Sequence, residues 1–304
     1  MKIAFFTEMG FDGKISRTHE NMRTEFSWMC ALDAEHHSIH LPPIFTEYDL
    51  GIIIIPKKDP KFDINRFKQC CKIAVMQEGP NWFYQDYSLE QQIWYFNTLT
   101  QADIIYTHNE IDKKYYSGLT NHQDVRVMQS LMIEEAIGVL PKVERKGVII
   151  GGNFVSWYGG FDSFIIAQEM DGGKVTAPSM GRKQPGEEEL LTHLPYLNWK
   201  EWIHKLNEFK YGVHLMRTFA AGTFALNCSY LGIPCIGYGS LDTQLTLHPS
   251  LSIANVGDLE TAKFLAERLK TEEDFYNKCS IQTKELYNEH YTEKQFLTKF
   301  NKKW

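Results

Sequence analysis

Two glycine-containing turns follow predicted strands, where peptide N–H groups can approach an anionic ligand closely. The first turn holds Gly10, Gly13 and Lys14 after the apolar run 2–6. Its spacing matches neither the G-x-G-x-x-G pattern of dinucleotide-binding proteins nor the G-x-x-x-x-G-K-[ST] phosphate loop. A nucleotide-dependent oxidoreductase is therefore disfavoured, and the turn is either a ligand-binding loop or a simple chain reversal.

The second turn, residues 151–160, links a predicted strand to a predicted helix and includes Gly152 and Asn153. Amides at the N-terminus of such a helix can bind a pyrophosphate, because the helix dipole favours negative charge there. A wide turn with a purely structural role is the alternative.

A third segment, residues 216–237, has the pattern of a strand end, a loop, a helix and another strand. Gly222 and Thr223 open the predicted helix, and Gly232 closes it as a C-cap. Arg217 stands at the end of the preceding strand, where it faces the predicted cleft.

The two turns and segment 216–237 need buried strands to hold them in place. Short apolar runs alternate with helical segments along the chain. This alternation predicts an α/β fold with buried parallel sheets. Strands are predicted at 2–6, 50–55, 73–76, 103–107, 147–151, 211–216 and 234–237. Helices are predicted at 17–32, 88–101, 161–170, 223–231, 258–269, from 271 onward and at 292–300. Capping boxes are predicted at Ser88 with Gln91 and at Thr292 with Gln295.

The alternation restarts after the polar stretch 141–146, which predicts two successive α/β domains with a break near residue 140. Sheets that face each other place the carboxyl ends of their strands, and hence their loops, around one crevice. Ligands bind in such a crevice in open α/β folds.

The composition is that of a globular protein, with 304 residues, 43% of them apolar, and a formal charge of −6. Intrinsic disorder is excluded as the main state. A spanning helix is excluded too, because the longest strongly apolar run, 50–55, is far below the roughly 20 residues required. The six cysteines form no CxxC pair and follow no signal segment, which predicts a cytoplasmic protein with reduced thiols. The adjacent Cys70 and Cys71 are either two such thiols or a redox or metal pair.

Charge is distributed unevenly along the chain. The first 140 residues carry 19 acidic and 13 basic side chains, whereas the rest carry 19 of each. This balance disfavours non-specific duplex binding, which depends on neutralising phosphates. Segment 57–72 is the exception, with six cations and two anions, and it either faces phosphates or forms a solvated helix face.

Segment 216–237 resembles the donor-nucleotide segment of glycosyltransferases with the two-Rossmann-domain B fold (GT-B), which has the pattern G-x-x-x-x-E-A-x-x-x-G-x-P-V-I. Turn 151–160 stands where that family has its phosphate loop, G-R-x-x-x-x-K-G, and 285–300 resembles the closing helices. The resemblance implies two Rossmann-like domains facing across a cleft, at 1–140 for the acceptor and 141–285 for the donor. It also implies a C-terminal helix, 286–304, that returns to the first domain.

The same resemblance implies transfer of a sugar from a nucleotide sugar, such as a UDP-sugar, to a hydroxyl group. The acidic residue with which the family clamps the ribose aligns with Asn227, and the phosphate-loop cations align near Asn153 and Tyr158. The diphosphate charge must therefore be met elsewhere. Three loop cations are the candidates: Arg182, Lys183 and Arg217. For the first two, a solvated surface position is the alternative.

In the first half, segments 74–78 and 102–109 are similar in layout to bacteriophage α-glucosyltransferases, which modify hydroxymethylcytosine in DNA. Those enzymes have a strand ending in Y-Q-H and a later A-D-V-I-F-S-H-S. This likeness implies a hydroxymethylated DNA base as acceptor and, for a phage-encoded protein, the cytoplasm of the host.

Sugar transfer needs a base for the acceptor hydroxyl and stabilisation of the departing phosphate oxygen. The candidate bases are Asp12, Glu78 and His108, with Asp86 as a further carboxylate. Each of them could instead serve in capping or packing.

The aromatic segment 79–87 supplies candidates for acceptor binding, namely Trp82, Tyr84 and Asp86. Aromatic faces there could stack on a sugar or on an extruded base, or they could anchor the loop to the core.

No metal or cofactor is expected beyond the nucleotide sugar itself. The chain has no Asp-x-Asp pair, and the histidines at 36, 37 and 40 have no Cys or carboxylate at ligand spacing. Two other functions remain open. The acidic first half favours a glycan or small-molecule acceptor, and the missing cations would permit a non-catalytic nucleotide-sugar-binding module. Membrane insertion is not expected, and the oligomeric state is not predicted.

Overall fold

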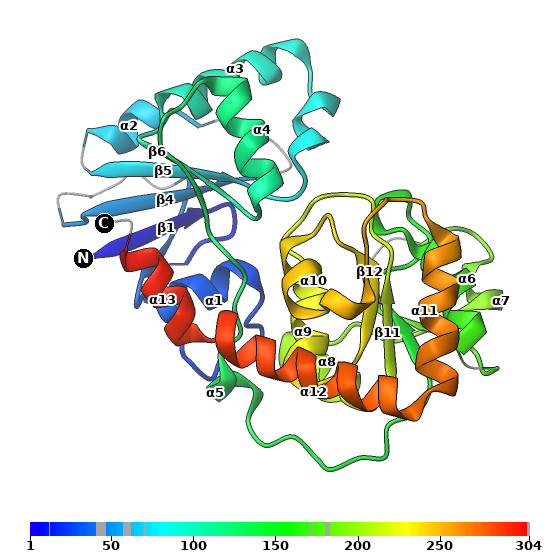
Figure 1. Cartoon of the computed structure of the whole chain (residues 1–304). Coiled ribbons are helices and arrows are strands. Elements are labelled where there is room, and N and C mark those ends of the chain that lie inside the picture. The colour runs from blue at the N-terminus through cyan, green and yellow to red at the C-terminus, as the bar shows by residue number, and fades with distance from the viewer. Residues whose placement is uncertain are drawn as a thin grey trace.

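The computed structural model describes residues 1–11, 13–40, 47–56, 62–69, 71–170, 172–179 and 183–302. These residues form two α/β units, each built on its own sheet (Figure 1). The first sheet has the strand order β2-β3-β1-β4-β5-β6-β7, and the second has the order β10-β9-β8-β11-β12-β13.

All strand pairs in the first sheet are parallel except β2 with β3. Its strands are β1 (Ile3–Thr7), β2 (Gly13–Lys14), β3 (Glu35–Ser38), β4 (Leu50–Ile55), β5 (Lys72–Gln77), β6 (Ile104–Thr107) and β7 (Val125–Val127). The central strand β4 is buried along its whole length, because helices cover both faces of the sheet. The helical elements of this unit are α1 (Thr24–Ala31), α2 (Ile64–Lys68), the 3-10 helix η1 (Asn81–Asp86), α3 (Leu89–Gln101), α4 (Glu110–Thr120) and α5 (Glu134–Ile137).

The second sheet is parallel throughout. Its strands are β8 (Val148–Ile150), β9 (Thr176–Ala177), β10 (Thr192–His193), β11 (Tyr211–His214), β12 (Cys235–Tyr238) and β13 (Ser252–Ile253). Its helical elements are the 3-10 helix η2 (Ser156–Tyr158), α6 (Gly160–Met170), α7 (Glu187–Leu190), α8 (Trp199–Leu206), α9 (Thr223–Leu231), α10 (Asp242–Leu247), the 3-10 helix η3 (Pro249–Leu251) and α11 (Leu259–Thr271).

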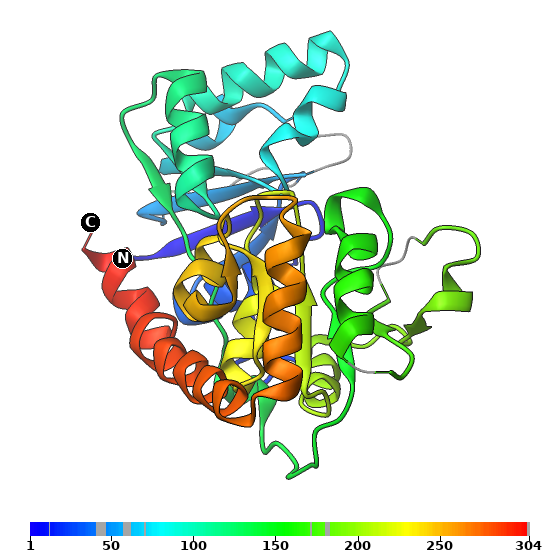
Figure 2. The same cartoon turned by 45° about the vertical axis from the view of Figure 1, so that its right-hand side comes forward.

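Two closing helices, α12 (Glu273–His290) and α13 (Glu293–Asn301), connect the second unit with the first. Figures 1 and 2 show α12 running along the second unit and α13 lying beside the first sheet. Phe300 of α13 stacks on Tyr106 of β6 with 6.2 Å between ring centroids, and Glu293 pairs with Arg17 at 2.6 Å. One apolar core therefore includes residues from both units and from the closing helices.

Most predicted strands and helices are confirmed, but three predictions need correction. The helix predicted at 17–32 begins only at Thr24, because the backbone of Arg23 before it is extended, with φ −85° and ψ 147°. The helix predicted from 271 begins at Glu273. At the last helix, the Thr292 hydroxyl accepts from the backbone of Gln295, but within the described part of the chain no bond from the Gln295 side chain to the Thr292 backbone completes the capping box.

The full capping box at Ser88 and Gln91 is confirmed. Strand β3 was not predicted, because its sequence Glu-His-His-Ser lacks an apolar run. It is held by pairing with β1 and by a 2.8 Å hydrogen bond between Thr7 Oγ1 and the buried His36. No helix within the described ranges is long and apolar enough to cross a membrane.

Candidate functional site

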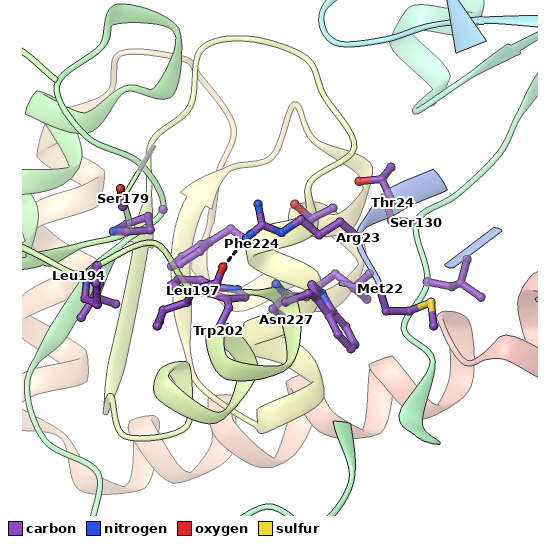
Figure 3. A pocket seen from close by; sticks show the side chains of 17 residues that line it. Met22, Arg23, Thr24, Ser130, Ser179, Leu194, Leu197, Trp202, Phe224 and Asn227 are labelled. Carbon is purple, nitrogen blue, oxygen red and sulfur yellow. Dashed lines mark hydrogen bonds between the residues drawn. The ribbon is translucent and has the colours of Figure 1, made fainter. Parts of the chain in front are cut away.

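A cavity of about 180 Å³ is lined by residues of both units (Figure 3). From the first unit come the loop before α1 and the segment after β7. From the second come the carboxyl ends of β8, β9 and β10 and one face of α8 and α9. The lining includes Arg23, Thr24, Ser130, Gly151, Ser179, Leu194, Trp202, Thr223, Phe224 and Asn227. The cavity thus opens at the edge where parallel α/β sheets bind ligands.

The start of α9 forms one wall of this cavity through Thr223, Phe224 and Asn227. Gly222 precedes the helix with φ +66°, and a Cβ there would overlap the Thr243 hydroxyl. Glycine is therefore required both by backbone conformation and by space. Among the residues that the structure describes, no side chain caps this helix N-terminus, so its first amides and the helix dipole favour an anionic group nearby.

Asn227 is almost fully buried in the cavity wall and bonds to a neighbouring helix. In the amide orientation that satisfies both its groups, Oδ1 accepts from Trp202 Nε1 at 2.9 Å and Nδ2 donates to the Thr223 carbonyl at 3.2 Å. Figure 3 shows the two side chains next to each other. The residue that aligns with the ribose-clamping carboxylate therefore lines the cavity, but it does so as a neutral amide.

Turn 151–160 reaches the cavity at Gly151 and packs tightly against the end of β11. Gly159 has φ +61°, and a Cβ there would overlap the Leu215 carbonyl. The Phe154 amide donates to the buried carboxylate of Glu187 at 3.3 Å. That amide of the predicted phosphate-binding turn is therefore already bonded within the protein. Gly152 and Asn153 lie in this turn, and Asn153 is buried.

Arg217 lies beside this turn rather than among the cavity-lining residues. Its Nη2 is 2.8 Å from Asp162 Oδ2, in the first turn of α6, and its side chain is 55% exposed. Lys183 similarly pairs with Glu188 at 3.3 Å. Arg182 lies outside the described residues. Two of the three cations proposed for the diphosphate therefore already face a carboxylate.

Arg23, which the sequence patterns did not single out, is a cation in the cavity lining. Its Nη2 donates to the Leu197 carbonyl at 2.8 Å (Figure 3). Its guanidinium lies 5.5 Å from the ring centre of Tyr196. Arg23 comes from the first unit and both partners come from the second. This arginine can therefore bring positive charge to the cavity from across the cleft.

His214, at the end of β11, lies behind the cavity wall. Its ring centroid is 5.3 Å from that of Phe224, and a Cβ on Gly151 would overlap the ring. Burial lowers the pKa of His214 to about 4. The ring is therefore neutral at pH 7 and contributes packing rather than positive charge.

The candidate bases lie at the carboxyl edge of the first sheet. Glu78 and His108 come directly after the last residues of their strands, Gln77 of β5 and Thr107 of β6. They consequently end neighbouring strands. His108 stacks on Trp28 of α1, with centroids 5.8 Å apart. Asp12 lies outside the described residues.

The aromatic segment forms η1, and its members point to different partners. Trp82 lies 6.4 Å from Trp157 of the second unit, centroid to centroid. Tyr84 stacks on the buried Tyr95 at 4.7 Å and shares a 2.7 Å hydrogen bond with Tyr115. Asp86 is exposed. Trp82 therefore faces the second unit, whereas Tyr84 anchors the segment to the first.

The first glycine turn lies apart from the cavity-lining residues. Gly13 and Lys14 form the short edge strand β2, and Lys14 pairs with Asp33 at 2.6 Å. A Cβ on Gly10 would overlap the His37 carbonyl, so this turn packs against β3. That Gly10, Gly13 and Lys14 form a ligand-binding loop, with the sugar donor as its ligand, stays a prediction.

Across the part of the chain that the structure describes, no group of three or more His, Cys, Asp or Glu side chains could hold a metal ion. Cys30, Cys228, Cys235 and Cys279 are buried thiols without a disulfide. Cys70 and residues 57–61 of the basic segment lie outside the described residues.

No family model matches the chain, and no curated protein sequence does. Solved structures match it over most of its length. An alpha-glucosyltransferase in complex with UDP-glucose and DNA containing an abasic site shares 14% identity, with TM-score 0.65, over 99% of this chain and 98% of that one. TarM of S. aureus, solved with Fondaparinux, alpha-GlcNAc-glycerol and UDP, shares 8% identity with TM-score 0.63, over 83% of this chain and 55% of that one.

Sucrose-phosphate synthase from Thermosynechococcus elongatus shares 12% identity with TM-score 0.61, over 84% of this chain and 72% of that one. The fold that these structures share with the chain is the GT-B fold. The fold implied by the resemblance at 216–237 is therefore confirmed.

Proposed function

We propose that the protein is a glycosyltransferase that moves a sugar from a UDP-sugar to a hydroxyl acceptor. The observation that carries the proposal is the cavity between the units, where Gly151, Thr223 and Asn227 meet. They come from the two segments that correspond to donor-binding segments of GT-B enzymes. UDP in the structures of the similar alpha-glucosyltransferase and of TarM supports the same donor class.

In the proposed reaction, the bond between the sugar C1 and the β-phosphate oxygen breaks, and a new bond forms between C1 and the acceptor oxygen. UDP leaves with the electron pair, and the acceptor proton passes to a base, for which Glu78 and His108 are the candidates. The N-terminus of α9, with Arg217 and Arg23, would stabilise the departing diphosphate. The reaction would need no metal, so transfer should persist in EDTA.

We further propose that the acceptor is a hydroxymethylated cytosine in DNA. The chain covers 98% of the length of the alpha-glucosyltransferase solved with DNA, but only 55% of the length of TarM. A related complex contains a 13-mer DNA with a HMU base. Trp82 faces the opposite unit at 6.4 Å from Trp157, where an extruded base could stack on an aromatic face. Asp86, exposed on the same segment, is a second contact for the acceptor.

Mass spectrometry of DNA tests this proposal. Duplexes with hydroxymethylcytosine, and identical duplexes with cytosine, are incubated with the protein and a panel of UDP-sugars. We expect a mass increase of one hexosyl or pentosyl residue only in the hydroxymethylated duplex. Glycan and small-molecule acceptors form the second arm, since the acidic first 140 residues would suit an acceptor that is not polyanionic.

A non-catalytic nucleotide-sugar-binding module is the second candidate. Two features favour it. Asn227 is a neutral amide whose two polar groups already bond within the protein, and the Asp162 carboxylate offsets the positive charge of Arg217. Calorimetry with UDP-sugars, followed by an assay of donor hydrolysis, separates the two functions. Binding without hydrolysis or transfer to any acceptor would support the module.

A further inference from the structure

Hydrogen bonds join the two units where helix α4 begins. Asp242 Oδ2, from the second unit, accepts from the backbone N–H of Glu110 at 2.9 Å. Asn109, the buried N-cap of α4, donates from Nδ2 to the carbonyl of Ala220 at 3.3 Å. A carboxylate of one unit therefore caps a helix of the other, and that helix's own cap reaches back across the cleft.

The loop that contains Ala220, which Asn109 holds, leads directly into the cavity wall. Ser130, a buried cavity-lining residue of the first unit, donates from Oγ to the carbonyl of Ala221 at 3.0 Å. Gly222 and Thr223, which open α9, follow at once. The first unit therefore fixes the position of the loop that ends at the donor-binding helix.

Further hydrogen bonds connect Asn109 with the aromatic segment 79–87, which lies on the proposed acceptor side. Asp112 is buried in α4, and its Oδ2 accepts from Asn109 Nδ2 at 2.9 Å. Its Oδ1 accepts from Asn81 Nδ2, also at 2.9 Å, and Asn81 is the first residue of η1. One continuous set of side chains thus links η1, the start of α4 and the loop before α9.

We propose that Asn109 and Asp242 are positioning residues that hold the donor-side loop and the aromatic segment in their relative positions for transfer. This inference rests on the proposed glycosyltransferase function, since it assigns these residues to the alignment of its two substrates. Neither residue lines the cavity. Asn109 acts by binding the carbonyl of Ala220, and Asp242 acts by binding the backbone N–H of Glu110.

Burial explains why the network should be sensitive to the loss of one member. Burial raises the pKa of Asp112 to about 6, although the bonds from Asn109 and Asn81 lower it, and burial also raises the pKa of Asp242. Among the described residues, the charged and titratable groups that face the two carboxyls are each other, Glu110, Tyr115, Tyr116 and Tyr291. The amide and N–H donors therefore offset the desolvation of these carboxylates.

The test uses the full chain with Asn109→Ala, Asp242→Ala and Asp242→Asn. The asparagine variant keeps an oxygen that can accept from Glu110, so it should restore function. The matched control is Asp258→Ala, which removes an N-cap that accepts from Thr261 within the second unit alone. Three quantities are measured: the kcat of transfer, the Kd for UDP by calorimetry, and the radius of gyration by solution scattering.

We expect the two alanine variants to lower kcat about tenfold or more, because small misalignments of bound reactants are costly. The Kd for UDP should change less than about threefold, since the second unit supplies most of the cavity wall. Scattering should show a larger radius of gyration for these variants than for the wild type. Asp242→Asn and the Asp258→Ala control should behave like the wild type in kcat and in scattering.

Wild-type kcat and scattering in folded Asn109→Ala and Asp242→Ala would overturn the inference. An equal loss in the Asp258→Ala control would also overturn it, because a general loss of stability would then explain the effect. If the wild type transfers no sugar to any acceptor, the proposed function fails. Scattering alone then decides whether these residues hold the two units together.

Discussion

Arg217 and Asp162 form an ion pair at the edge of the second sheet, with Nη2 2.8 Å from Oδ2. The pair joins the end of β11 to the first turn of α6, next to turn 151–160, which the sequence predicts to be a phosphate-binding turn. The carboxylate offsets the charge that a diphosphate would meet. Because the arginine is 55% exposed, exchange of one anionic partner for another requires little desolvation.

We predict that Asp162→Asn tightens UDP binding and that Arg217→Ala weakens it. The first change releases the guanidinium, so the Kd for UDP should fall about threefold at low salt and less at high salt. The second should raise the Kd about tenfold with little effect on acceptor binding. Calorimetry at two salt concentrations measures both, with Lys263→Ala, an exposed lysine that pairs with Glu169, as the control cation. Unchanged UDP affinity in Arg217→Ala would remove this residue from the donor site.

Asn227 is predicted to contribute to nucleoside recognition. Asn227→Ala should raise the Kd for UDP about tenfold, since it deletes a buried polar group from the cavity wall. Trp202→Phe is the companion variant, because it removes the indole N–H that donates to Asn227 while keeping an aromatic ring. Uridine should lose the same affinity as UDP if the contact is to the ribose. A loss confined to UDP would assign Asn227 to the phosphates instead.

The buried carboxyl of Asp112 makes a prediction about stability and pH. Its pKa rises from 3.8 to about 6 on folding, so the folded state keeps this proton to a higher pH than the unfolded state. The stabilisation is therefore fully present below pH 3.8 and is lost as the pH rises through 6. Relative to Asp112→Asn, the wild type should lose on the order of 2 kcal/mol of unfolding free energy over that window.

Urea unfolding at a series of pH values measures this difference. Asp258→Asn is the control of opposite sign, because backbone hydrogen bonding from Thr261 lowers the pKa of Asp258. Its contribution is present above the unfolded pKa and is lost on acidification. A flat difference between wild type and Asp112→Asn from pH 3 to 7 would refute the assignment.

Gly222 and Gly118 form a matched pair for substitution by alanine. Gly222→Ala combines a positive φ with overlap on Thr243 and should destabilise the protein by at least about 2 kcal/mol. Gly118 lies within α4 with open space around its Cα, so Gly118→Ala should stabilise by about 0.5–1 kcal/mol. Thermal unfolding compares the two variants. Equal effects would show that the start of α9 is not constrained as described.

The strands were predictable where apolar runs are buried on both faces, as in β4 and β5. Strand β3 was not, because His36 is buried through pairing with β1 rather than through its own apolar character. The non-helical segment before α1 was not predictable either, since partners more than a hundred residues away hold Arg17.

The donor wall of the cavity was predictable in part, because Gly222, Thr223 and Asn227 follow one another in a recognisable pattern. Arg23 and Ser130 carry no local signal, because both come from the first unit and line the cavity only through the packing of that unit on the second. The pairing of Arg217 with Asp162 is only weakly indicated by the sequence. Asp162 opens the helix after β8, and β8 is the parallel neighbour of the strand that ends before Arg217.

A crystal structure of the protein with UDP tests most directly whether the cavity between the units is the donor site. We expect the uridine within hydrogen-bonding distance of Asn227 and the diphosphate at the N-terminus of α9. Clear density for UDP on another surface, with the cavity empty, would contradict the proposed donor site.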